Sequence, residues 1–248
     1  MITIKSSADL DIMREGGNIL KGVFKVVEDN IKEGMTTKQV DELVYNYIKS
    51  CGASAPCIGY CGYPAATCIS IDDMVIHGIP SDDVVIKKGQ IVSVDVVVEY
   101  KGLMTDATRT YKIGEVSPEK EKLVRVTEEC FFKAIENLRV GTPVGDIGYH
   151  VQSHAEANGF SVVKAFSGHG IGREMHEDPS IPNYGRKGTG FRLKKGMVIC
   201  IEPMINAGDY KVEIMSDGWG VRTLDGKPAA HYENTVVITE DGVEILTL

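Results

Sequence analysis

Apolar residues recur every three or four positions in four segments of the chain, which is the spacing of one helix face. Ser6-Ser7 can cap the first segment, and Pro118 suits the first turn of the third. Gly52 and Gly159 are placed to end the second and the fourth. The predicted helices cover residues 7–27, 37–51, 117–138 and 144–158.

Other apolar runs predict strands rather than helices. In residues 91–110, a Val-rich run, a turn at Lys101-Gly102 and a second run predict a hairpin. Short strands dominate the second half of the chain, and 197–203 and 233–239 are the clearest of them. No linker or low-complexity stretch divides the chain, so we expect a single domain.

The chain also contains an internal repeat. Residues 33–52 and 140–159 match in glycine and apolar positions, and the register continues downstream without a gap. It places Asp95 and Glu202 at equivalent positions, each beside an apolar strand-like run. Such long-period similarity indicates a duplicated helix-plus-strand unit, with chance agreement of hydrophobic patterns as the alternative.

Composition limits the classes of function. The chain has 248 residues, is 43% hydrophobic and 25% charged, and carries a formal net charge of −8. Phosphate binding requires clustered Lys and Arg, so we expect no nucleic-acid substrate. The net charge does not exclude a local basic patch, such as Lys194-Lys195. No apolar run approaches the ~18 residues of a membrane span, and the N-terminus lacks the apolar core of a signal peptide. We therefore expect a cytoplasmic protein without a membrane partner.

The cysteines do not suggest a disulfide framework. Six are present, and none of them forms a C-x-x-C pair in the segment that holds Cys51, Cys57, Cys61 and Cys68. Reduced thiols in a cytoplasmic protein are the favoured interpretation, and a zinc knuckle is the alternative.

Asp95 interrupts the apolar run of the predicted hairpin, where an unpaired buried charge costs several kcal/mol. A two-residue turn pairs Tyr100 with Leu103 and so places Asp106 opposite Val97. Asp95 and Asp106 then share one face, with Cα atoms ~7–8 Å apart; a turn one residue longer would separate them. Two carboxylates at that separation repel, so either one stays protonated or a cation lies between them.

Further candidate ligands stand beside other apolar runs. Glu202 and Glu233 could each be an edge or surface carboxylate, but four carboxylates together favour hard divalent cations. In residues 167–179, His169 lies between glycines and His176 follows; incidental histidines in a glycine-rich turn are the alternative. Four carboxylates and one imidazole suit two metals that share carboxylates and activate water for amide or phosphate hydrolysis.

These motifs together resemble those of type I methionine aminopeptidases. The resemblance implies an α+β pita-bread (creatinase/aminopeptidase) fold with a pseudo-two-fold repeat, in which a central antiparallel sheet carries helices on its outer face. It covers essentially the whole chain and implies one metallo-aminopeptidase catalytic domain over residues 1–248. The stretches that carry it are 57–80, 94–108, 167–179, 200–208 and 231–239.

The resemblance implies a role for each ligand. Asp95 would chelate one metal, Asp106 and Glu233 would bridge both metals, and His169 and Glu202 would complete the ligand set of the second metal. The cofactors would be two divalent ions of Co, Mn, Fe, Zn or Ni, and the sequence does not select among them.

The resemblance also implies catalytic and substrate-binding residues. Glu202 would shuttle protons to and from the attacking water, and His77 would contact the scissile amide and help to protonate the leaving nitrogen. His176 would stabilise the developing oxyanion. A methionine thioether suits soft and aromatic walls. The first side chain of the substrate would be held by Cys57, Tyr60, Tyr63, Cys68, Met175 and Trp219.

The implied function is removal of the initiator methionine from nascent polypeptides when the second residue is small. The implied enzyme is a monomer whose partners are nascent N-termini, with transient ribosome contact. Two residues depart from the family pattern: Val97 stands where Thr is frequent, and Met175 where an aromatic residue is common. Neither departure removes a ligand.

Two other functions use the same fold. Proline-specific aminopeptidases and prolidases carry the same ligand order but usually have a large N-terminal domain, for which 248 residues leave no room. Non-enzymatic binding proteins of this fold lose ligands, whereas all five ligand positions are filled here.

Overall fold

The computed structural model describes residues 2–248 and contains the predicted helices. Ser6 and Ser117 cap the first and third helices with their side chains, as expected. The third helix stops short of Leu138, whose N–H donates to the Ile135 carbonyl in a closing turn. No helix in the described part of the chain is long and apolar enough to cross a membrane. The helices are α1 (Ser7–Asn30), α2 (Thr37–Ser50), α3 (Pro118–Ile135) and α4 (Val144–Ala157).

The main sheet is antiparallel throughout and follows the order β1-β3-β4-β13-β8-β6-β7, with β14 paired to β13. The strand predicted at 197–203 ends at Ile201, because Pro203 has no N–H to give to a ladder. The strands are β1 (Thr67–Ile71), β3 (Ile91–Tyr100), β4 (Leu103–Lys112), β6 (Ser167–Gly170), β7 (Glu177–Pro182), β8 (Val198–Ile201), β13 (Glu233–Ile238) and β14 (Val243–Ile245).

Smaller sheets and one short helix lie beside the main sheet. A 3-10 helix covers Tyr60–Gly62. The order β10-β11-β2 forms one small sheet and β12-β9-β5 another. Their strands are β2 (Met74–Ile76), β5 (Ser161–Val162), β9 (Met204–Asn206), β10 (Val212–Ile214), β11 (Val221–Thr223) and β12 (Ala229–His231).

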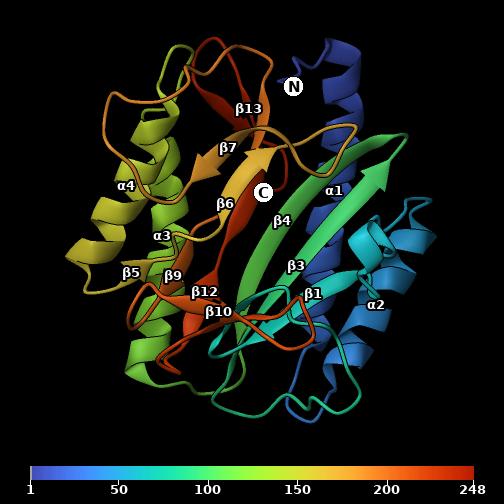
Figure 1. Cartoon of the computed structure of the whole chain (residues 1–248). Helices are drawn as coiled ribbons and strands as arrows, with labels where there is room; N and C mark the ends of the chain where they lie inside the picture. Colours follow the sequence, from blue (N-terminus) through green and yellow to red (C-terminus); the bar gives the residue numbers. More distant parts are fainter. Residues whose placement is uncertain (1) are drawn as a thin grey trace.

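The arrangement has the predicted pseudo-symmetry. Strands β4 and β13 lie at the centre of the main sheet, with β3 on one side and β8, the strand of the second repeat copy, on the other. Figure 1 shows α1 and α2 beside the β3 half, and α3 and α4 together on the other side. Each helix pair packs on its own half, which confirms the α+β fold with helices backing an antiparallel sheet.

Alternation along β3 explains why the strand tolerates Asp95. Val92, Val94, Val96 and Val98 face α1 and α2 in one apolar core. The alternate positions point to the opposite face of the sheet. Valine occupies both faces of this strand, so its sequence reads as one apolar run although only one face belongs to that core. Asp95 is therefore kept out of the helix-facing core.

Candidate metal centre

The β3–β4 hairpin has the predicted register. Its turn at Lys101 and Gly102 has positive φ at both residues, as a two-residue hairpin turn requires. Asp106 lies opposite Val97, and Asp95 lies opposite Thr108. Asp95 and Asp106 therefore lie one diagonal step apart on the same face of the sheet.

Strand β13 adds Glu233 to this face. Glu233 is the ladder partner of Thr108 in β4, and its Oε2 accepts a hydrogen bond of 3.0 Å from the Thr108 hydroxyl. The Thr235 hydroxyl accepts from the N–H of Asp106 at 2.9 Å and donates to its carbonyl at 2.8 Å. These two threonines fix the junction of the central strands and bring Asp106 and Glu233 together.

Strand β6 brings His169 to the same point. A Cβ at Gly168 would overlap the carbonyl oxygen of Cys200, and one at Gly170 would overlap that of Asp178. The flanking glycines are thus required for close approach of neighbouring strands rather than for a turn. His169 Nδ1 must donate to the Gly170 carbonyl, 2.8 Å away, because that oxygen only accepts.

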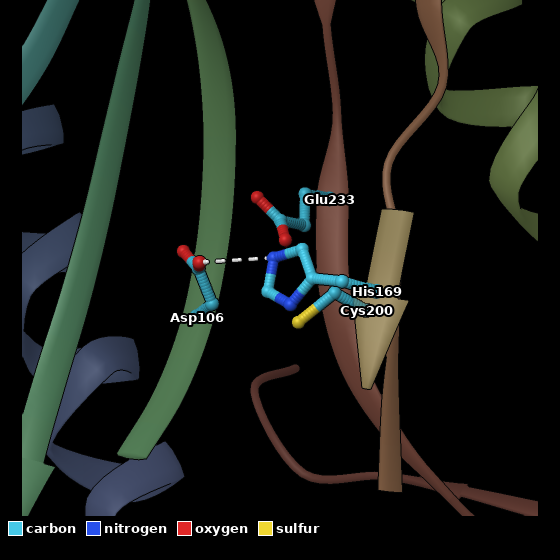
Figure 2. Close-up of side chains that lie close together, drawn as sticks. All are labelled: Asp106, His169, Cys200 and Glu233. Carbon is cyan, nitrogen blue, oxygen red and sulfur yellow. Dashed lines mark ion pairs between the residues drawn. The ribbon is translucent and has the colours of Figure 1, made fainter. Parts of the chain in front are cut away.

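The tautomer of His169 leaves the Nε2 lone pair free to bind a metal. Nε2 lies 3.8 Å from Asp106 Oδ2 and 3.6 Å from Glu202 Oε1. Burial lowers the pKa of His169 to about 4, which keeps the ring neutral. Figure 2 shows this ring beside Asp106 and Glu233, with the contact between Nε2 and the Asp106 carboxylate dashed.

Cys200 is a neighbour that the sequence analysis did not identify. One potential ligand atom from each of Asp106, His169, Cys200 and Glu233 lies within 4.8 Å of the others (Figure 2). Cys200 lies two residues before Glu202, so strand alternation could have placed both side chains on one face. Burial raises the pKa of its thiol well above the ordinary value, which keeps it protonated in the metal-free site.

Three oxygens of the acidic side chains lack hydrogen-bond partners and fit divalent cations. Asp95 Oδ1, Asp106 Oδ1 and Glu233 Oε1 are buried without a hydrogen-bond partner. Burial, followed by repulsion from neighbouring carboxylates, raises the pKa of Asp106, Glu202 and Glu233 well above the ordinary value. Burial also raises that of Asp95, to about 6. Converging buried oxygens without a positive partner are what a hard divalent cation would satisfy.

All five predicted metal ligands line one cavity of about 280 Å³ together with His77 and His176. The structure therefore brings together the predicted metal ligands and the two histidines that were predicted to be catalytic. Phe166 and His231 were missed: Phe166 meets the His77 ring at 5.8 Å, and His231 precedes Glu233 by two positions. The remaining lining residues are Ile76, Ala165 and Ser167.

His176 is held by contacts on two sides. Its ring centroid lies 4.3 Å from that of His169, and its Nδ1 lies 2.8 Å from the Tyr60 hydroxyl. Partial desolvation lowers the pKa of His176, and burial lowers that of His77 to about 4. Both rings are therefore neutral near pH 7 and can donate hydrogen bonds without carrying charge into the cavity.

A buried apolar cluster adjoins the cavity through β3. Cys57, Tyr63, Cys68 and Met175 form one buried cluster with Val97, against which Trp219 packs. The Tyr63 and Trp219 rings meet edge to face at 4.9 Å. Both departures from the family pattern, Val97 and Met175, thus belong to this cluster.

The remaining pocket candidate, Tyr60, lies outside this buried cluster. It is 38% exposed, and its hydroxyl is directed to His176. The pocket thiols have no disulfide partners, and all six cysteines of the chain are free, as expected. Burial raises the pKa of Cys57 and Cys68 well above the ordinary value, so they contribute neutral, polarisable walls.

Comparison with known proteins agrees with this geometry. A methionine aminopeptidase of Clostridium perfringens is 48% identical over 248 residues, which are 100% of this chain and 99% of that protein. The crystal structure of methionine aminopeptidase from Rickettsia prowazekii has a TM-score of 0.98 at 42% identity and covers 100% of both chains. This likeness confirms the predicted pita-bread fold.

A prolidase is more distant. The prolidase from Pyrococcus furiosus has a TM-score of 0.79 at 25% identity, and the match covers 99% of this chain but 65% of that one. The model of metallopeptidase family M24 matches residues 11–240. Since that match spans most of the sequence and the site gathers metal-binding side chains, the chain belongs to metallopeptidase family M24.

Proposed function

We propose that this metallopeptidase is a methionine aminopeptidase that removes the initiator methionine from polypeptides whose second residue is small. One observation carries the proposal: Val97 of the apolar cluster is the ladder partner of Asp106 in the metal cavity. We take the residues of this cluster to form the pocket for the first side chain of the substrate. A side chain held in the pocket therefore brings the peptide bond beside it to the carboxylates. The relatives named methionine aminopeptidase, which match over the full length, support the same substrate.

We propose that the site takes two divalent ions of Co, Mn, Fe, Zn or Ni. Asp95 would bind one ion, Asp106 and Glu233 would be shared, and His169 and Glu202 would bind the second. The orphaned oxygens of Asp95, Asp106 and Glu233 support this assignment. Bound divalent ions supply Lewis acidity, which polarises a carbonyl and lowers the pKa of water.

The protein groups then divide the proton transfers among them. The Glu202 carboxylate accepts a proton from the attacking water and returns it toward the leaving nitrogen. His77 lies on the cavity wall and, as a neutral ring that keeps its proton, donates a hydrogen bond to that nitrogen as the amide bond breaks. His176 donates to the carbonyl oxygen as negative charge develops there. The products are free methionine and the shortened chain.

The pocket selects the first residue, and the cavity limits the second. Cys57, Cys68 and Met175 offer soft, apolar contacts to a thioether, and Trp219 and Tyr63 add aromatic edges. The cavity of about 280 Å³ is shared with the metal ligands, which leaves room for a small second side chain.

The test is methionine release from Met-Ala-Ser and Met-Leu-Ser by protein stripped of metal and then titrated with Mn(II). We expect release from Met-Ala-Ser that rises with Mn(II), and much slower release from Met-Leu-Ser. Equal rates for the two peptides would contradict the limit on the second residue. Metal-independent release would contradict the site.

We further propose that residues 1–248 act as one catalytic domain and as a monomer in the cytoplasm. Initiator methionine is removed from nascent chains, so the partners would be their N-termini, with transient ribosome contact. Sedimentation of the purified protein with and without ribosomes tests the oligomeric state and the ribosome contact. We expect a monomer whose binding to ribosomes weakens as the salt concentration rises.

A further inference from the structure

His231 is a cavity residue to which the proposed mechanism gives no task. It is the last residue of β12, is 2% exposed, and lines the cavity that holds the metal ligands. Its backbone is fixed, because its N–H donates to the Thr110 hydroxyl and its carbonyl accepts from the same hydroxyl at 2.7 Å. The ring therefore has a defined place.

The imidazole of His231 has an unused polar atom. Its Nε2 is buried and has no hydrogen-bond partner. Leaving a buried donor or acceptor unpaired costs about 1–3 kcal/mol. The carboxylate oxygen beside it is Oε2 of Glu202, 4.0 Å away. A shift of roughly 1 Å would bring the pair to hydrogen-bond length.

Glu202 thus lies between two imidazoles, which contact different oxygens. Oε1 lies 3.6 Å from His169 Nε2, and Oε2 lies 4.0 Å from His231 Nε2. His169 cannot donate to Glu202 in its observed tautomer, because its proton is on Nδ1 and is given to Gly170. His231 Nε2 carries no such restriction.

We propose that His231 is a positioning residue for Glu202: its Nε2–H donates to Oε2 and fixes the rotation of the carboxylate, so that Oε1 faces the metals and the reacting water. This inference rests on the proposed function. A carboxylate that both binds metal and moves a proton must present a defined oxygen to each task. Partners that orient a metal ligand are typically worth 10- to 100-fold in affinity or activity.

The experiment compares two substitutions that differ in the donor. His231→Gln keeps an N–H at similar reach, whereas His231→Met keeps the bulk and removes the donor. We expect His231→Met to lower kcat for Met-Ala-Ser by about 10- to 100-fold with KM within about twofold, and to weaken Mn(II) binding in calorimetry. His231→Gln should restore most of both. Unfolding temperatures of the two variants should agree.

A matched control removes a histidine elsewhere. His154→Met breaks a 2.8 Å contact with Glu129 on the helical face and should leave kcat and Mn(II) affinity unchanged. Wild-type kcat and Mn(II) affinity in His231→Met would overturn the proposal, and so would equal impairment of His231→Gln and His231→Met. Absence of methionine release by the wild-type protein would refute the proposed function instead, while the Mn(II) comparison would still decide the role of His231.

Discussion

The Tyr60 hydroxyl lies 2.8 Å from Nδ1 of His176, although Tyr60 belongs to the exposed 3-10 helix and not to the buried pocket. Desolvation raises the pKa of the Tyr60 phenol, so it keeps its proton and can donate to a neutral imidazole. His176 then carries its own proton on Nε2. In the proposed mechanism Tyr60 would therefore prepare His176 to donate to a carbonyl oxygen, a role in addition to the pocket wall that the resemblance implied.

Tyr60→Phe tests this relationship. The variant keeps the ring and loses the hydroxyl, so we expect kcat for Met-Ala-Ser to fall between about twofold and tenfold, the value of one hydrogen bond. KM should change little, because the ring stays in place. Steady-state kinetics measures both. A loss confined to KM would instead support the pocket-wall role.

Removal of a shared carboxylate should abolish the metal site. Asp106→Asn or Glu233→Gln takes charge from the centre of the cluster, so we expect loss of Mn(II) binding in calorimetry and loss of turnover. His77→Ala is the matched control, since it should bind Mn(II) normally and lose about 100-fold in kcat. Retained activity in either carboxylate variant, or full kcat in His77→Ala, would contradict the assigned roles.

The metal-free protein should lose stability as pH rises. The raised pKa values of Asp106, Glu202 and Glu233 mean that the folded state holds protons that the unfolded chain releases above about pH 4. The folded state is then the one that binds more protons, so its stability falls with rising pH. The pKa of Asp95 is about 6, so the part of the stability that depends on Asp95 is lost between pH 4 and 6.

Thermal unfolding from pH 5 to 8 measures that loss. We expect the unfolding temperature of the metal-free protein to fall above about pH 6.5. Below that pH the lowered pKa values of His77 and His169 oppose the fall, because the unfolded chain then binds protons that these buried rings do not. Saturating Mn(II) should reduce the fall, because the ion cancels the repulsion between the carboxylates. Glu202→Gln should flatten the metal-free curve by removing one titrating group. Parallel curves with and without Mn(II) would argue against metal binding at these carboxylates.

The pocket wall should control affinity for the first residue. Trp219→Ala removes the aromatic edge that packs on Tyr63, and we expect kcat/KM for Met-Ala-Ser to fall about tenfold, mainly through KM. Mn(II) affinity should not change. Leu224→Ala is the control, because this side chain is 57% exposed and its removal should leave kcat/KM unchanged. Unchanged kinetics in Trp219→Ala would place the methionine side chain elsewhere.

Local signals explain what could be predicted from the sequence. Ser6 and Ser117 predict where their helices begin, because capping depends only on residues within one helical turn. The register that brings Asp95 beside Asp106 depends only on a two-residue turn. The repeat then relates Asp95 to Glu202 without any knowledge of the sheet order.

The missed features depend on long-range packing. Tyr60 meets His176 from 116 positions away in the sequence, and no local pattern joins a 3-10 helix to the residue before β7. His231 belongs to β12, a strand of a separate small sheet, and reaches the cavity only because β12 leads directly into β13. The glycines beside His169 suggested a turn, whereas contacts with neighbouring strands explain them.

In the proposed function, one metal-dependent site releases an N-terminal methionine. The most direct measurement is product analysis for Met-Ala-Ser and Ala-Pro-Ser incubated with the chelator-stripped protein as Mn(II) is added. We predict free methionine from the first peptide, in amounts that rise with Mn(II), and no cleavage of the second. Cleavage of the Ala-Pro bond would assign the chain a proline-specific activity, and cleavage of neither peptide despite tight Mn(II) binding would contradict the peptidase assignment.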